Sequence, residues 1–359
     1  MAYTTIDDPS AHFQTTLYTG NGSDDHAITN GGNSDLQSDL LWFKERANAG
    51  AHSLHNSTNN VSLFLESNTS GTENYDTTTL KSIQTDGFTL GTESNHNQAS
   101  TTYVAWQWKA NGGTRTTFSE SGNNPAGGYQ ANTTGGFSIV DYTGTQATGT
   151  VAHGLGAVPK MIIVKDRDAA RSWSVYHHQM GSPAVEKNMH LNTKAAVTDY
   201  NAEYWGGTNP TTSVFSLGNA HDINYNNRKY IAYCFAEKQG YSKFGSYVAN
   251  ANTNGPFVYT GFKPAWIMVK NTSRSGYAWS IIDNKRDTFN EVDNGLEGDA
   301  ISAEFSSSAN YGCDFLSNGF KVRSVSTGYL GAVSGDTLIY MAFAESPFVT
   351  STGTPTTAR

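Results

Sequence analysis

The chain alternates between short apolar runs and clusters of Gly, Asn, Ser and Asp. One apolar run ends in lysine and occurs three times, as Asp39 to Lys44, Lys160 to Lys165 and Ala265 to Lys270. Short runs rich in Val, Ile, Tyr, Phe and Trp, bounded by turn residues, are typical of β-strands. No segment carries apolar residues at helical spacing over three turns, so the pattern predicts an all-β protein.

Three further landmarks follow each lysine in the same order. They are a serine between larger residues (52–55, 173–176 and 279–282), a phenylalanine after Gly or Val (88, 215 and 320), and a closing strand that ends in Trp108, Phe235 or Phe343. From the lysine to that last aromatic residue the distances are 64, 70 and 73 residues. This recurrence predicts three tandem antiparallel β-sandwich repeats, jelly-roll-like, with Trp108, Phe235 and Phe343 as equivalent core residues.

The landmarks also divide the chain. We expect an N-terminal arm plus the first sandwich at 1–110, a Gly/Ser/Asn-rich linker at 111–135, further sandwiches at 136–243 and 244–350, and a polar tail at 351–359. The linker composition predicts a flexible or surface-draped segment. Because no such spacer separates the last two sandwiches, these should be the more rigidly docked pair. The stretch Ala2 to Phe13 precedes the first clear strand and contains Pro9, which favours an anchoring arm.

Composition argues against nucleic acid and membranes as partners of this chain. Charged residues make up 15% of the chain and the formal net charge is −8, which argues against binding to nucleic acid. The longest apolar runs have seven residues, too few for membrane insertion, and the first residues lack the basic and apolar regions of a secretory signal. Cys234 and Cys313 fall in different repeats, so we expect two free thiols rather than a disulfide.

A search for chemistry-bearing motifs finds no catalytic, cofactor-binding or metal-binding set. Phosphate-binding loops and Gly-x-Ser-x-Gly are absent from the sequence, and the pairs His52 with His55 and His177 with His178 lack further ligands at zinc spacing. The acidic stretches 166–168 and 293–299 do not follow the order of a calcium loop, and turn chemistry explains them equally well.

Two sets of repeated or aromatic residues remain. Lys44, Lys165 and Lys270 could contact phosphate or carboxylate, but we favour strand ends whose stems snorkel over the sheet edge. Trp205 and Tyr329 lie beside glycine-containing turns and are candidate binding-loop aromatics, for either a sugar ring or a protein surface. Trp173 and Trp279 are expected to fill their sandwich cores.

Several of these motifs resemble a known family. The stretches that carry the resemblance are Tyr3 to Pro9, Leu17 to Gly20, Trp42 to Lys44, Asp86 to Gly91, Tyr103 to Trp106, Gly154 to Lys160 and Phe343 to Phe348. They resemble a repeat family in structural and tail-fibre proteins of marine bacteriophages, and more loosely concanavalin- or SPRY-like sandwiches. The first repeat departs from the pattern, because His52 stands where the others have tryptophan.

The resemblance implies a non-enzymatic virion structural protein, made in the host cytoplasm without a signal peptide and exposed on the outer surface or tail. Such a protein would be a tail fibre, an appendage or a capsid-decorating protein. Its expected partners are other virion proteins through the N-terminal arm, further copies of itself with a trimer favoured, and host-surface glycan. Two alternatives stay open: an array of carbohydrate-binding modules, and a glycan depolymerase whose paired carboxylates one sequence cannot reveal.

Overall fold

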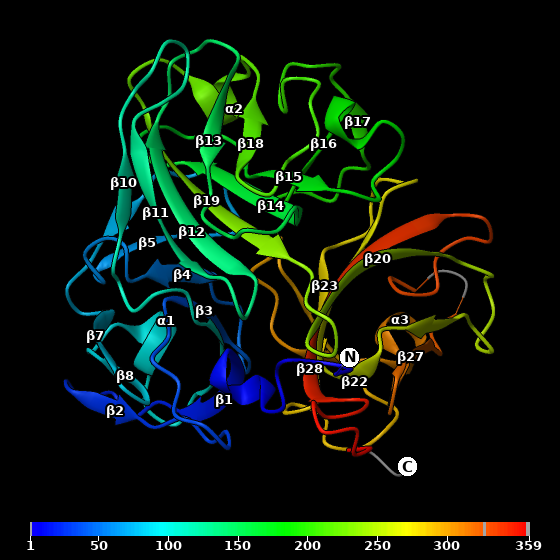
Figure 1. Ribbon diagram of the computed structural model, residues 1–359. Helices are drawn as coiled ribbons and strands as arrows, with labels where there is room; N and C mark the ends of the chain where they lie inside the picture. Colours follow the sequence, from blue (N-terminus) through cyan, green and yellow to red (C-terminus); the bar gives the residue numbers. More distant parts are fainter. Residues whose placement is uncertain (1, 326–327, 357–359) are drawn as a thin grey trace.

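The computed structural model describes residues 2–325 and 328–356. Its sheets are antiparallel and its helical segments are single short turns, so the all-β prediction is confirmed. Figure 1 shows three lobes around a common centre, in blue to cyan, green, and yellow to red. We call them unit 1 (residues 13–108), unit 2 (116–236) and unit 3 (242–347). In the part of the chain that is described, none of the helices has the length and apolar character needed to cross a bilayer.

Unit 1 consists of a large and a small sheet. The large sheet has the strand order β1-β9-β3-β4-β5-β6, and the small sheet has the order β2-β8-β7. After the short helix η1 (Pro9–Ala11), the elements are β1 (Phe13–Thr19), β2 (His26–Ile28), β3 (Leu40–Glu45), β4 (Ser53–Asn56), β5 (Leu63–Leu65), β6 (Asn74–Tyr75), β7 (Leu80–Gln84), β8 (Gly87–Leu90), α1 (Ser94–Asn97) and β9 (Thr102–Trp108).

Unit 2 has the same plan with two additional strands at one edge. Its large sheet runs β10-β11-β12-β19-β14-β15-β16-β17, and β13 pairs with β18. The elements are β10 (Thr116–Phe118), β11 (Gly127–Asn132), β12 (Phe137–Thr143), β13 (Gly149–Ala152), β14 (Pro159–Asp166), β15 (Ser174–His177), η2 (Ala184–Glu186), β16 (Lys187–His190), β17 (Thr198–Asp199), β18 (Val214–Leu217), α2 (His221–Asn224) and β19 (Lys229–Ala236).

Unit 3 repeats the plan of unit 1. Its sheets run β20-β28-β22-β23-β24-β25 and β21-β27-β26. The elements are β20 (Ser242–Val248), β21 (Phe257–Tyr259), β22 (Phe262–Asn271), β23 (Ser280–Asp283), β24 (Asn294–Glu297), β25 (Phe305–Ser306), α3 (Ser308–Tyr311), β26 (Cys313–Leu316), β27 (Gly319–Val322) and β28 (Thr337–Pro347).

The three large sheets share one strand order and one register. In each unit the closing strand lies between the lysine-ending strand and one earlier strand, which is β1, β12 or β20. The three orders are β1-β9-β3, β12-β19-β14 and β20-β28-β22. The serine of the second landmark pairs with the residue before the lysine in all three: Phe43 with Ser53, Val164 with Ser174, and Val269 with Ser280. The sequence landmarks therefore mark equivalent places in three copies of one fold.

Both faces of each large sheet are buried, which explains why its strands are apolar at consecutive positions. Along β3, Leu41 and Phe43 pack with the small sheet of unit 1, whereas Leu40 and Trp42 face a core shared by all three units. Strand β22 alternates in the same way between its own sandwich core and the shared core. The shared core therefore lies between the three units, in addition to the packing within each unit.

The predicted linker and the predicted anchoring arm both differ from the structure. Residues 111–135 contain β10 and β11, and β11 pairs with β12 along its length, so this segment is part of the sheet of unit 2. The arm packs against its own chain: Ile6 is 3% exposed, and the Tyr3 hydroxyl donates to the main-chain oxygen of Gly261 at 2.6 Å. Main-chain hydrogen bonds thus make residues 127–132 part of a sheet, and apolar burial together with a side-chain hydrogen bond holds the N-terminal stretch on the folded chain.

The two cysteines are unpaired, as expected. Cys234 lies in β19 and Cys313 in β26, and both are buried. Burial raises the pKa of the Cys313 thiol well above its usual value. Both thiols are therefore protonated, unreactive core groups.

Candidate functional site

The three units meet at an aromatic cluster. The rings of Trp108, Phe235 and Phe343, each at most 2% exposed, come from the equivalent ends of β9, β19 and β28. Their centroids are 6.2 Å apart for Trp108 and Phe235, 5.7 Å for Trp108 and Phe343, and 6.2 Å for Phe235 and Phe343. Three equivalent residues at nearly equal mutual distances define a pseudo-threefold axis within one chain.

A hydrogen bond crosses each junction between units at one equivalent position. The indole Nε1 of Trp173 donates to the main-chain oxygen of Glu66 at 2.9 Å, and that of Trp279 donates to His190 at 3.0 Å. His52 occupies the same position in unit 1, and its Nε2 lies 2.9 Å from the main-chain oxygen of Glu297. Unit 2 thus reaches unit 1, unit 3 reaches unit 2, and unit 1 reaches unit 3. The contacts close a ring.

A second equivalent set of contacts follows the outer side of the junctions. Main-chain amides of Glu73, Val197 and Glu304 donate to the oxygens of Arg167, Thr272 and Arg46 at 3.0, 3.1 and 2.8 Å. Two of these junctions add paired Arg–Glu hydrogen bonds: Arg167 with Glu73, both at 2.8 Å, and Arg46 with Glu304, at 2.9 and 2.8 Å. Where unit 3 meets unit 2, Lys194 instead binds Glu297 at 2.8 Å.

The repeated lysines do not snorkel, so that prediction is wrong. Lys44, Lys165 and Lys270 are fully buried, and burial lowers the pKa of each to about 8. Their ammonium groups donate to main-chain oxygens: that of Lys165 to Asp166 at 2.8 Å and to Ser70 of unit 1 at 3.2 Å. Lys165 and Lys270 thus donate to main-chain oxygens of the preceding unit, at Ser70 and Thr193, whereas Lys44 donates to Glu45 within its own unit. Each bond satisfies a carbonyl oxygen that would be costly to bury without a donor.

The two candidate binding-loop aromatics have different positions. Trp205 is 2% exposed and packs on Tyr176 with ring centroids 5.7 Å apart, so its predicted place on an exposed loop is wrong. Tyr329 is partly exposed and lies against Tyr311, with centroids 5.4 Å apart. It lines a hollow of about 430 Å³ in unit 3 together with Tyr311, Glu297, Glu304 and Asn310.

The carboxylates of this hollow are already engaged. Glu297 binds Lys194 and lies 3.3 Å from the Tyr311 hydroxyl, while Glu304 binds Arg46 and Arg286. A general acid must bring a free carboxyl group to the substrate, whereas both carboxylates here already bind cationic side chains of the protein. Two tyrosine rings beside fixed carboxylates suit the binding of a hydroxylated ligand better than its cleavage.

The structure brings together one constellation that the sequence analysis missed. In unit 1 the Ser53 hydroxyl lies 2.5 Å from His96 Nε2, and His96 Nδ1 lies 2.7 Å from a carboxylate oxygen of Glu93. The order serine, histidine, carboxylate is the one used in acyl transfer. Glu93 and His96 are three residues apart, but Ser53 lies 43 residues from His96 and the three follow no motif, so no sequence signal could have joined them.

The surroundings of Ser53 favour a structural role. Ser53 is 3% exposed beside a hollow of about 70 Å³, whereas ligand sites usually enclose roughly 300–1,000 Å³. The equivalent Ser174 and Ser280 hydroxyls are buried without a hydrogen-bond partner among the described residues. The serine is therefore a repeated structural residue. In unit 1 its hydroxyl is hydrogen-bonded to His96, whereas unit 2 has Ile223 at the position of His96.

The candidate metal-binding histidines are neutral buried groups, and the acidic stretch 166–168 takes part in a turn. Burial lowers the pKa of His52, His55 and His177 to about 3, so all three are neutral. Asp166 accepts the amides of residues 168 and 169, which is turn chemistry. Across residues 2–325 and 328–356, His, Cys, Asp and Glu side chains form no group of three or more that could hold a metal ion.

Comparisons with known proteins give one family match. Residues 8–347 match the model of a domain of unknown function, DUF7483. Neither the curated proteins nor the solved structures include a match. The matched segment spans the three units, from η1 to the end of β28. The chain therefore belongs to the DUF7483 family.

Proposed function

We propose that this chain is a non-enzymatic structural protein of a bacteriophage particle, in which one polypeptide forms a closed block with pseudo-threefold geometry. The observation that carries the proposal is the meeting of Trp108, Phe235 and Phe343 on one axis. The phage assignment itself rests on the sequence resemblance. Three equivalent units packed around one axis suit a load-bearing or decorating component, because positions on a particle follow its symmetry.

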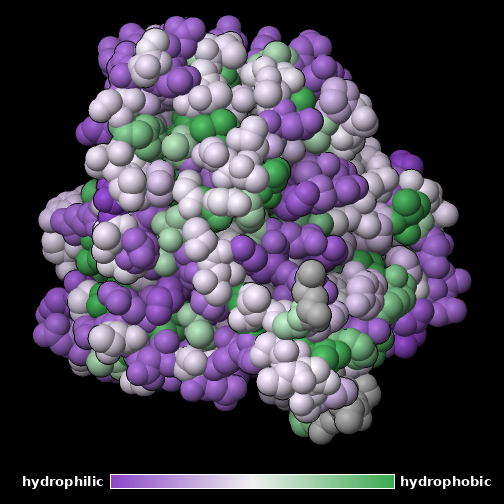
Figure 2. All heavy atoms as spheres, in the orientation of Figure 1, coloured by the Kyte–Doolittle hydropathy of each residue, from purple (hydrophilic) through white to green (hydrophobic). Residues whose placement is uncertain are grey.

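The geometry changes the proposed assembly. A trimer was favoured from sequence because fibres are built on threefold axes, but here three units already surround an axis within one chain. We therefore propose that a single copy occupies a threefold position on the particle. The surface view in Figure 2 fits exposure to water, since hydrophilic and hydrophobic atoms are interspersed in small groups over this face.

Three measurements test this function. Purified particles should contain the chain at a fixed copy number by quantitative mass spectrometry, and antibody-labelled particles should carry it on the outer surface or tail. The isolated protein should have the mass of a monomer, 38.7 kDa, in light scattering. A protein that stays in the soluble fraction of infected cells and is absent from purified particles would contradict the proposal.

A second candidate function, binding of host-surface glycan, is favoured by the hollow beside Tyr329. Its two tyrosine rings could stack on a sugar face while Asn310, Glu297 and Glu304 accept or donate hydrogen bonds to hydroxyl groups. A glycan array should then show binding that Tyr329→Ala abolishes. Tyr277→Ala removes a neighbouring ring that packs on Tyr329, with centroids 6.2 Å apart, from outside the hollow, and serves as the matched control.

A further inference from the structure

The same corner of the fold occurs at all three junctions. It is formed by the residue five positions before the repeated lysine and by the two residues after the next strand. In unit 1 these are Asp39, Ser57 and Thr58; in unit 2, Lys160, His178 and Gln179; in unit 3, Ala265, Asn284 and Lys285. A main-chain bond confirms the equivalence, since the amides of Ser57, His178 and Asn284 donate to the first residue of each set. Each corner faces the first strand of the next unit.

At the first corner the chain fills the space with its own strand. β11 adds to the edge of β12, where Gln130 pairs with Ile139. The Gln130 Nε2 donates to the hydroxyls of Ser57 and Thr58 at 2.8 and 2.6 Å, and its Oε1 accepts the amide of Gly113 at 2.9 Å. One glutamine on an added strand thus forms hydrogen bonds with both residues that follow the second strand of the corner, Ser57 and Thr58.

At the second corner longer side chains reach the strand edge directly. His178 Nε2 lies 3.0 Å from the main-chain oxygen of Phe244, and Glu237 accepts the Phe244 amide at 3.4 Å. Phe244 occupies the place of Ile139, because both pair with the residue two before the closing aromatic residue. The outward main-chain groups of β20 are therefore already partnered at this point.

The third corner, between unit 3 and unit 1, is open. Two adjoining hollows of about 200 and 830 Å³ share Asn33, Asn284, Lys285 and Glu345 as lining residues. We call this space the 3–1 groove. One side of it is β1, which is the edge strand of its sheet and presents Thr15 at the position of Ile139 and Phe244.

Buried polar groups in the 3–1 groove lack the partners that Gln130 supplies elsewhere. The Asn284 side-chain oxygen and the Thr15 hydroxyl are buried with no hydrogen-bond partner among the described residues. A buried acceptor without a hydrogen bond destabilises the protein, and a donor from a partner removes that cost. Asn284 is only partly buried as a residue and lines both hollows, so rotation of its terminal amide turns the oxygen toward the groove.

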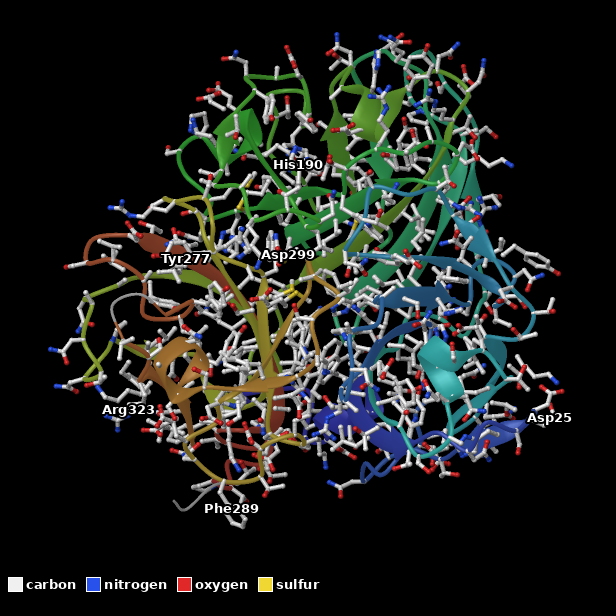
Figure 3. All side chains as sticks on the ribbon, turned by 180° about the vertical axis from the view of Figure 1, so that it is seen from behind. Asp25, His190, Tyr277, Phe289, Asp299 and Arg323 are labelled. Atoms are coloured by element: carbon white, nitrogen blue, oxygen red, sulfur yellow. The ribbon has the colours of Figure 1, made fainter. Side chains whose placement is uncertain are left out.

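The rim of the groove also carries an exposed aromatic side chain. Phe289 is 80% exposed and lines the larger hollow. Figure 3 shows it projecting from the end of unit 3, away from the other labelled residues. Aromatic anchors of this kind are enriched in the buried centres of protein interfaces.

From these observations we propose that the 3–1 groove binds an extended segment of a partner protein, which adds to the edge of β1 as β11 adds to β12 and inserts a glutamine side chain into the corner. The glutamine Nε2 donates to Asn284 Oδ1, and its Oε1 accepts from the Lys285 ammonium. The partner's main chain pairs with β1 beside Thr15, and an apolar residue of the partner covers Phe289. For the structural protein proposed above, this groove is the attachment surface.

The probe is a synthetic peptide with the sequence of residues 124–134 of this chain, because that sequence fills the equivalent corner. Its binding to the full-length protein is measured by calorimetry. We expect saturable one-to-one binding with Kd of about 1 mM or tighter, at least a tenfold loss with Asn284→Ala plus Lys285→Ala, and the same loss when leucine replaces the glutamine of the peptide. Circular dichroism verifies that the variant is folded.

The matched control is Ser57→Ala, at the corner that β11 already fills, which should leave the peptide affinity unchanged. Absence of saturable binding at several millimolar peptide, or binding that is indifferent to both Asn284 and the peptide glutamine, would overturn the groove proposal. Because the assay uses the isolated protein, either result is independent of whether the chain is found in virions.

Discussion

The indole Nε1 of Trp173 in unit 2 donates to the main-chain oxygen of Glu66 in unit 1, 2.9 Å away. His52 makes the equivalent contact from unit 1 to unit 3 with a different ring, so the position preserves a hydrogen-bonding group rather than a residue type. Three such bonds run in the same direction around the axis. Each unit is therefore joined to both of the others by one of these bonds.

Removing one junction donor should destabilise the whole protein. Trp173→Phe keeps an aromatic ring but leaves the Glu66 oxygen buried without its donor, at an expected cost of about 1–3 kcal/mol in the free energy of unfolding. Trp205→Phe is the matched control, because the Trp205 Nε1 is buried with no partner among the described residues. Urea unfolding of both variants checks this, and equal losses in the two would argue against the junction bond.

The buried lysines predict a rise in stability in mild alkali. Burial lowers the pKa of Lys165 in the folded state to about 8, from the ordinary lysine value of 10.5. Between these values Lys165 binds its proton more fully in the unfolded chain than in the folded protein, so its contribution to the free energy of unfolding increases as pH rises from 8 to 10. Lys165→Met should reduce this slope by about 1 kcal/mol per pH unit.

The exposed Lys229, at the start of β19, provides the control for that experiment. Lys229→Met should leave the slope unchanged. Chemical unfolding at pH 8, 9 and 10 measures all three proteins, and a Lys165→Met slope equal to that of the wild type would mean that the ammonium group is solvated in the folded state.

Asp299 should be replaceable by asparagine with a gain in stability at neutral pH. Its Oδ1 accepts the Trp279 amide at 2.8 Å, where units 1 and 2 use Asn68 and Asn192 for the equivalent bond. Burial raises the pKa of Asp299 above the ordinary aspartate value of 3.8, so the ionised form costs folding free energy at pH 7. The cost is absent below the pKa of the unfolded chain. Figure 3 shows Asp299 deep in the centre of the molecule, near His190.

The measurement for this substitution is thermal unfolding of Asp299→Asn at pH 7 and at pH 3.5. We expect a higher midpoint than the wild type at pH 7 and a much smaller difference at pH 3.5. The reverse substitution, Asn192→Asp, places a carboxylate at the equivalent point of unit 2 and should lower the midpoint at pH 7. A loss of stability with Asp299→Asn at both pH values would contradict the burial argument.

The Ser53–His96–Glu93 arrangement should be catalytically silent. A fluorophosphonate probe, which modifies activated serines, should not label the folded protein, because Ser53 is 3% exposed beside a very small hollow. Ser53→Ala provides the background level of labelling. Stoichiometric labelling that Ser53→Ala abolishes would show an enzyme and would contradict the non-enzymatic proposal.

Sequence patterns located the repeats because strands that are buried on both faces must be apolar at consecutive positions, as in Tyr230 to Ala236. They could not show that Lys165 is buried, because a strand-ending lysine looks the same whether its ammonium meets water or carbonyl oxygens of the next unit. They misplaced β11, whose Gly, Gln and Asn residues resemble a linker but pair with a strand edge. The site residues depend on contacts between units, and these carry no local signal.

The central claim is that the three units form one closed ring that unfolds as a whole. Hydrogen exchange with mass spectrometry tests it on the wild type and on Arg46→Met, which removes the ion pair to Glu304 between unit 1 and unit 3. The account predicts equally slow exchange of β9, β19 and β28 in the wild type, and an equal acceleration of all three in the variant, including β19 in unit 2. Acceleration confined to units 1 and 3, or separate exchange rates for the three closing strands, would contradict the closed ring.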